Sequence, residues 1–286
     1  MMKTARRLIQ ILVAGVSLQF FTGCTWNPFG SNDISGGYRE VSGTVQLHDG
    51  SSPEGVYVWL ESFNVGTTTD ETGQFTIALP AKSSQGASSG LSGVYNLYFF
   101  VANYGLKSAQ VVVQEGEFVY SRGDVNKDGR LAALIILKRF LRIEMDVDPA
   151  IVDENYTGNI RVTVTLTAAQ DSVSAIIPES IGDGSLGAVL IRKMSTREVF
   201  IHKFSIFGGM RVKVLVGRQS YNTGMNFNLI TKPLEAGMYE VIPFLLIAHE
   251  PIPEGMLDSI SLSAQNLCPD YLKIPFMRQG GAFEVR

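Results

Sequence analysis

Most of the chain is a series of short segments in which hydrophobic and polar residues alternate, separated by clusters of glycine, proline and aspartate. The alternation is clearest in residues 160–167, where Ile160, Val162, Val164 and Leu166 are separated by arginine and threonine. A period of two places one row of side chains in a core and the other in water. No convincing helical period interrupts the series. The pattern therefore predicts an all-β protein built from antiparallel sheets rather than from alternating strands and helices.

The segments fall into two groups, which we expect to form two consecutive β-sandwiches. The first covers residues 38–139 and the second residues 140–286, with the boundary near Phe140. The second group is best matched by an immunoglobulin-like sandwich, because it consists of short alternating strands with turns between them. Strands are expected in the first group at 41–45, 55–60, 74–79, 95–101 and 109–113, and in the second at 142–149, 160–167, 187–192, 198–203, 210–216, 238–242, 259–263 and 282–285.

The first group carries a spaced set of glycine, valine and aromatic residues. Gly43 stands in the first strand, and Asp70 stands in a turn over residues 69–73, where its side chain can accept hydrogen bonds from nearby backbone. Phe75 and Ile77 then point into the core. With Pro53-x-Gly-Val before them and Tyr95-x-Leu-x-Phe after them, these residues resemble the carboxypeptidase regulatory-like domain over roughly residues 39–139.

That resemblance implies a seven-stranded sandwich of transthyretin type, acting as an accessory module without catalytic residues. One position departs from the family pattern. Asn103 stands where a glycine is usual before Tyr104 and Gly105. The departure is mild, because asparagine also tolerates a positive φ.

The start of the chain has the layout of an export signal. Residues 1–7 carry Lys3, Arg6 and Arg7 without an acidic residue, residues 8–21 are almost wholly apolar, and Thr-Gly-Cys24 follows. This resembles a bacterial lipobox, although Phe21 takes the place of the usual aliphatic residue. The resemblance implies a signal peptide over residues 1–23 and diacylation of the Cys24 sulfur.

Two other interpretations of the leader are a plain secretory signal and an uncleaved helix. No small-x-small cleavage site supports the first. Residues 8–21 fall short of the about 20 residues that a membrane-spanning helix needs. Residues 24–37 are rich in glycine, serine and asparagine and predict a flexible tether after the lipidated cysteine. We therefore expect a bacterial cell-envelope protein attached by lipid, in the outer membrane.

Charge and cysteine content limit the possible partners. Residues 1–23 hold three of the 24 basic residues and none of the 27 acidic ones, so cleavage changes the formal net charge from −3 to −6. This balance gives no basic surface for nucleic acid. Cys24 and Cys268 are the two cysteines, and lipidation of Cys24 leaves Cys268 without a disulfide partner. We expect Cys268 to be a small buried apolar residue, with a reactive thiol as the alternative.

One stretch resembles the start of a calcium-binding loop. Asp124, Asn126 and Asp128 supply oxygens at positions 1, 3 and 5, and Gly129 follows at position 6. The carboxylate expected at position 12 is replaced by Ile135. We therefore predict a turn at Asp128-Gly129 and no metal site, while weak calcium binding stays open. The adhesion tripeptide at residues 122–124 overlaps the same turn and is interpreted as chance.

The sequence offers little for catalysis. His48, His202 and His249 have no acid and nucleophile at a recognisable spacing, and no pair of them is spaced for zinc. We expect no enzymatic activity and no cofactor. The protein is interpreted as a non-catalytic binding or structural module whose partners are the membrane, through the lipid anchor, and an envelope protein or polysaccharide. The alternative is an accessory or carbohydrate-binding lipoprotein that serves a separate envelope enzyme.

Overall fold

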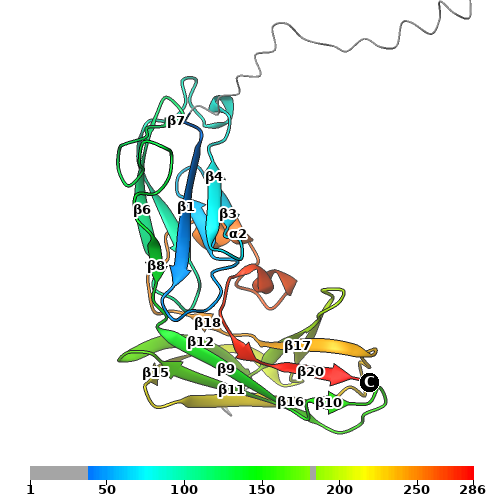
Figure 1. Ribbon diagram of the computed structural model, residues 1–286. Helices are drawn as coiled ribbons and strands as arrows, with labels where there is room; N and C mark the ends of the chain where they lie inside the picture. The colour runs from blue at the N-terminus through cyan, green and yellow to red at the C-terminus, as the bar shows by residue number, and fades with distance from the viewer. Residues whose placement is uncertain (1–37, 181–184) are drawn as a thin grey trace, which may run out of the picture. The chain divides into compact units, whose positions relative to one another are not determined.

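The computed structural model describes residues 38–180 and 185–286 (Figure 1). The predicted signal peptide, tether and Cys24 lie outside these residues. Nearly all regular structure is β, and the sheets form sandwich-like arrangements, as predicted. In the described residues the helical structure is one short α-helix, α2 (Met256–Ile260), and two 3₁₀ turns, Lys82–Ser84 and Pro269–Lys273.

The first sandwich has one sheet of three strands and one of five. In the first sheet, β1 lies between β4, to which it is antiparallel, and β8, to which it is parallel. The second sheet has the order β3-β2-β5-β6-β7 and is antiparallel throughout. The strand bounds are β1 (Glu40–Leu47), β2 (Tyr57–Leu60), β3 (Val65–Thr68), β4 (Gln74–Ala78), β5 (Gly93–Phe100), β6 (Lys107–Gln114), β7 (Glu117–Phe118) and β8 (Ile135–Leu137).

Two local predictions for this sandwich are confirmed. Asp70 Oδ1 accepts hydrogen bonds from the N–H groups of Thr72 (2.8 Å) and Gln74 (2.9 Å), so its side chain closes the turn before β4. Phe75 and Ile77 are buried. Gly43 has a packing role: a Cβ there would lie 2.8 Å from Cε1 of Phe75. The glycine makes room for that ring.

The second sandwich has the order β16-β11-β9-β19 in one sheet and β10-β20-β17-β13-β14 in another, with β15-β12-β18 beside them. The alternation predicted for residues 160–167 is confirmed in β11, whose Ile160, Val162, Val164 and Leu166 are buried. The bounds are β9 (Leu141–Asp148), β10 (Ile151–Val152), β11 (Ile160–Ala168), β12 (Ser172–Ser180), β13 (Ala188–Lys193), β14 (Val199–Lys203), β15 (Phe207–Gly217), β16 (Tyr221–Phe227), β17 (Gly237–Pro243), β18 (Leu246–Ile247), β19 (Gln279–Gly280) and β20 (Ala282–Val285).

The strand predicted at 259–263 is wrong. Residues 256–260 form α2, and turns follow it. The serines that suggested alternation bind locally: Ser259 Oγ donates to the Met256 carbonyl, and Ser261 and Ser263 donate to Asp270. Leu262 is 86 % exposed, so no apolar row forms.

Strands β12 and β16 were not predicted. β12 contains Pro178, which lies next to a register shift between Glu179 and Ser180 in its pairing with β15. Proline is tolerated in a sheet at such irregularities, because a missing N–H matters less there.

The buried hydrophobic residues of the described ranges, 38–180 and 185–286, form three clusters. One lies within residues 41–137 and a second within residues 141–285. The third joins Trp59 and Phe100 to residues between 188 and 274, including Phe244 and Tyr271. Residues 38–286 make one compact unit. The division into independent domains at 139/140 therefore stays a prediction.

Asn103 joins segments that are distant in sequence. Its fully buried side chain donates to the carbonyls of Leu141 and Met277, both at 2.9 Å, and accepts from the Met277 N–H at 3.0 Å. Asn103 is not among the residues with positive φ. The asparagine at this position is therefore explained by its hydrogen bonds rather than by a positive φ.

Replacing Asn103 by alanine should lower the free energy of unfolding by about 2–4 kcal/mol, because it removes the side-chain partner of the buried Leu141 carbonyl and of the half-buried N–H and carbonyl of Met277. Urea unfolding followed by circular dichroism measures the change. Asn226→Ala, at an exposed position of β16, is the matched control and should have little effect. Equal stability of the two variants would contradict the role given to Asn103.

Candidate functional site

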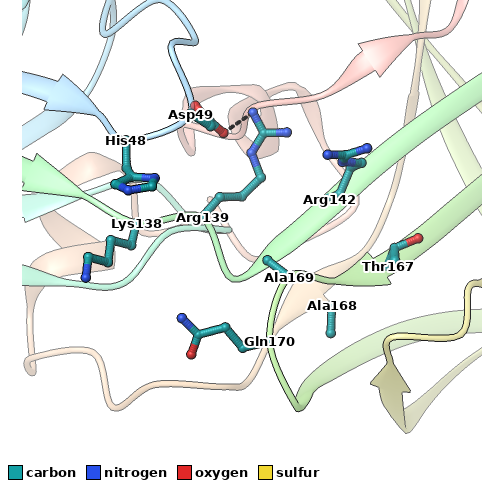
Figure 2. Close-up of a pocket in the computed structure, with 9 residues that line it drawn as sticks. All are labelled: His48, Asp49, Lys138, Arg139, Arg142, Thr167, Ala168, Ala169 and Gln170. Atoms are coloured by element: carbon teal, nitrogen blue, oxygen red, sulfur yellow. Dashed lines mark ion pairs between the residues drawn. The ribbon is translucent and has the colours of Figure 1, made fainter.

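A cleft of about 510 Å³ lies where four segments meet (Figure 2). The loop after β1 contributes His48 and Asp49, and the link between β8 and β9 contributes Lys138 and Arg139. Arg142 comes from the start of β9. The end of β11 and the turn after it contribute residues 167–170. The cleft therefore depends on how the link between the sandwiches is held.

That link is fixed by a partly buried polar network. Arg139 forms an ion pair with Asp49 (Figure 2), and its guanidinium also donates to Tyr104 Oη (2.9 Å) and Ser51 Oγ (2.7 Å). Tyr104, which is 2 % exposed, donates its hydroxyl to Asp49 at 2.8 Å. A charged pair with these additional hydrogen bonds is well satisfied. Arg139 and Asp49 therefore neutralise each other and join the link to the loop after β1.

The network sets the ionisation of its members. Burial acts to raise the pKa of Asp49, but hydrogen bonds from Tyr104 and Ser51 and the charge of Arg139 outweigh it, so this pKa lies below its usual value. Burial and the acceptor Asp49 raise the pKa of Tyr104. Asp49 is therefore an anion, and Tyr104 a neutral donor, at neutral pH.

The remaining charged groups of the cleft are cationic. Lys138 is exposed and forms no ion pair among the described residues, while Arg142 lies 3.7 Å from Glu144, a loose contact between exposed side chains. In Figure 2, Lys138 and Arg142 lie on either side of the Arg139 backbone, Thr167 lies next to Arg142, its partner on the neighbouring strand, and Gln170 lies below Lys138 and Arg139. Exposed pairs such as Arg142 with Glu144 contribute little and can be replaced. The cleft therefore favours an anionic group.

The three histidines have different surroundings. His48 is exposed at the cleft. His202 packs on Phe227 with ring centroids 5.1 Å apart, and burial together with the charge of Lys232 lowers its pKa. His249 packs on Phe140 at 4.8 Å. Their contacts are those of packing residues or of an exposed side chain.

The loop at residues 124–130 is a turn in which two of the proposed ligand groups already accept backbone hydrogen bonds. Asp124 Oδ2 accepts from the Gln110 N–H at 2.7 Å. Asn126 Oδ1 accepts from the N–H groups of Asp128 and Arg130, and Gly129 has a φ of 75°. The predicted turn at Asp128-Gly129 is confirmed, and residues 122–124 lead into it. Between residues 38 and 286, with the gap at 181–184, no three His, Cys, Asp or Glu side chains meet in a way that could hold a metal ion.

Cys268 is half-buried, so the prediction of a buried residue needs correction. Its Sγ lies 3.4 Å from the Ser263 carbonyl, and it forms no disulfide in the described part of the chain. Cys24, the predicted lipidation site, lies outside the described residues. None of the helices that the structure describes is long and apolar enough to cross a membrane.

The cleft was not found from sequence. Its signal was the run of basic residues at 138, 139 and 142 next to the predicted boundary. Sequence alone could not show that Arg139 forms an ion pair with Asp49, because Asp49 lies about 90 residues earlier in the chain.

Comparisons with known proteins add little. No family model and no curated protein matches this chain. Among solved structures, the Bacillus anthracis TIE protein is similar at a TM-score of 0.21 and 9% identity, over 74% of this chain and 46% of that one. CBD12 from CALX1.2 is similar at a TM-score of 0.19 and 8% identity, over 87% of this chain and 99% of that one. This chain thus spans less than half of the first protein, and scores this low carry no argument about function.

The Asp49 network makes a testable contribution to pH dependence. Because the pKa of Asp49 is lowered on folding, its stabilisation is complete above the unfolded pKa of about 3.9 and is lost as pH falls further. The melting temperature of Asp49→Asn should therefore lie below that of the wild type at pH 7, and the difference between the two melting temperatures should become smaller below about pH 4. Thermal melts across pH test this, with Asp171→Asn, at a 99% exposed side chain, as control. A gap that does not change with pH would contradict it.

Proposed function

We propose that the protein is a non-catalytic binding module of the bacterial cell envelope, tethered through a lipid on Cys24, which holds an anionic group of an envelope partner in the cleft at Lys138 and Arg142. The leader and tether pattern of residues 1–37 supports export and anchoring. The resemblance of residues 39–139 to a carboxypeptidase regulatory-like domain supports an accessory role. In this proposal the outer membrane is the site of the anchor.

The observation that carries the proposal is the division of charge in the cleft. Asp49 is engaged by Arg139, by the Tyr104 hydroxyl and by the Ser51 backbone N–H, so it does not neutralise Lys138 or Arg142. Two cations in a concave site attract an anion more strongly than the same cations on a convex surface, because the walls exclude water and focus the field.

The carbohydrate-binding alternative receives less support. Sugar sites commonly present aromatic faces to the ligand. Among the aromatic side chains that the structure describes, only Tyr38 is exposed, and the others are buried or half-buried. We therefore place the anionic partner first.

The anchor is tested by Cys24→Ser. The variant should not be acylated and should leave the membrane fraction, because acyl chains contribute about 0.8 kcal/mol per buried CH₂ and the remaining leader is too short to span. Fractionation after a high-salt wash measures this. A variant that stays with the membrane would contradict lipid anchoring and make residues 8–21 the anchor.

The cleft is tested by titrating the purified full-length protein with pyrophosphate and with citrate, two small polyanions that suit its volume. Lys138→Glu combined with Arg142→Glu should weaken binding about tenfold or more, because it removes two charge-assisted contacts. Lys107→Glu with Arg161→Glu makes the same change in net charge at exposed strand positions elsewhere and should bind like the wild type. Equal binding by the cleft variant and the wild type would contradict the proposal.

A further inference from the structure

Strand β15 (Phe207–Gly217) lies at the edge of its sheet and is the longest strand in the described residues. It pairs with β12 along one side, and the order β15-β12-β18 leaves its other side without a partner among residues 38–180 and 185–286 (Figure 1). An edge strand presents free N–H and C=O groups to solvent at every second residue. The free edge of β15 can therefore form backbone hydrogen bonds with one more strand.

The inward side of β15 is incompletely covered. On neighbouring β12 the inward residues Val173, Ala175 and Ile177 are 2%, 0% and 1% exposed. On β15 the inward residues Val212 and Val214 are only half-buried, whereas Val216 is fully buried. The apolar core is thus open along this edge over residues 212–214, and a further strand with apolar inward side chains would cover it.

The outward side of β15 is cationic. Arg211 and Lys213 are exposed, and neither forms an ion pair with a described carboxylate; Arg211 donates to the Gln265 carbonyl at 3.3 Å. The next outward residue, Leu215, is 72% exposed. A strand added here would meet two positive charges and one apolar side chain in alternate positions.

We propose that the free edge of β15 binds an extended acidic segment of a protein partner as an added β-strand. Backbone hydrogen bonds hold the segment, and its side chains select it. The residues opposite Arg211 and Lys213 are acidic, and those opposite Val212, Val214 and Leu215 are apolar. Directly opposed charges of opposite sign stabilise a strand pair, whereas like charges destabilise it.

The same rule disfavours a second copy of the chain as the occupant. Pairing of β15 with β15 brings the arginine and lysine of both copies onto one face of the joined sheet. Charged residues on edge strands also serve to prevent pairing with other chains. That protective role predicts that no strand binds, so the experiment separates it from the proposal.

The probe is a fluorescent peptide that contains Leu-Val-Glu-Val-Glu, the order that an antiparallel strand needs opposite residues 215 to 211. Binding to the full-length protein in a non-ionic detergent is followed by fluorescence anisotropy. A peptide with lysine in place of glutamate tests the charge, and one with N-methyl groups along one backbone edge tests the hydrogen bonds. Hydrogen exchange locates the bound strand.

We expect the acidic peptide to bind and to protect amides within residues 207–217, while the lysine and N-methyl peptides do not bind. Arg211→Glu with Lys213→Glu should weaken binding about tenfold or more. Lys107→Glu with Arg161→Glu, at exposed strand positions outside both β15 and the cleft, is the matched control, with the same change in net charge, and should bind normally. Three results would overturn the proposal: no binding of the acidic peptide, equal binding of the N-methyl peptide, or a dimer whose formation protects residues 207–217 without peptide.

Discussion

The pairing of residues 103–105 with the link between the sandwiches is the constraint on which the described structure depends. Tyr104 forms a single antiparallel bridge with Arg139, and the Gly105 N–H donates to the Lys138 carbonyl. The two side chains then act in different places: that of Asn103 reaches Leu141 and Met277, and that of Tyr104 reaches Asp49 and Arg139. One short segment after β5 thus fixes the start of β9 and the loop after β1.

This constraint also decides which charges are free. A half-buried arginine such as Arg139 needs a carboxylate partner and further acceptors, because an unpaired charge that is largely removed from water is costly. Arg139 pairs with Asp49 and donates hydrogen bonds to the hydroxyls of Tyr104 and Ser51. Lys138 precedes Arg139 in sequence and Arg142 follows it, and both side chains are exposed to solvent or to a ligand. The cationic cleft is therefore a consequence of the way the link is anchored.

Local chemistry was predictable from sequence where one short pattern determines it. The alternation in β11, the Asp70 turn and the turn at Asp128-Gly129 each depend on residues within a few positions of one another. The two-sandwich pattern of strands followed from the same signals.

Sequence reasoning failed where distant contacts decide the structure. The serines at 259–263 are a separate case, because the contacts that prevent a strand there are local: the Met256 carbonyl and Asp270 accept their hydrogen bonds. Asn103 was interpreted through its backbone, whereas its role depends on Met277, which lies 174 residues away. Pro178 in β12 is tolerated because of a register shift that only the pairing with β15 reveals. The Asp49–Arg139 pair likewise needed the three-dimensional structure.

The cleft and the β15 edge are both sites of modest intrinsic strength. An exposed ion pair contributes about 0–1 kcal/mol, and a cross-strand pair about 0.2–1 kcal/mol. Such sites bind weakly to a partner that diffuses freely in solution. A lipid anchor strengthens such weak binding. Attachment to the same surface as the partner raises the effective concentration of the partner near the site, to the millimolar range for short flexible linkers. Under the proposed function, the tether therefore supplies the part of the affinity that the two exposed sites lack, and loss of Cys24 acylation weakens partner binding without altering either site.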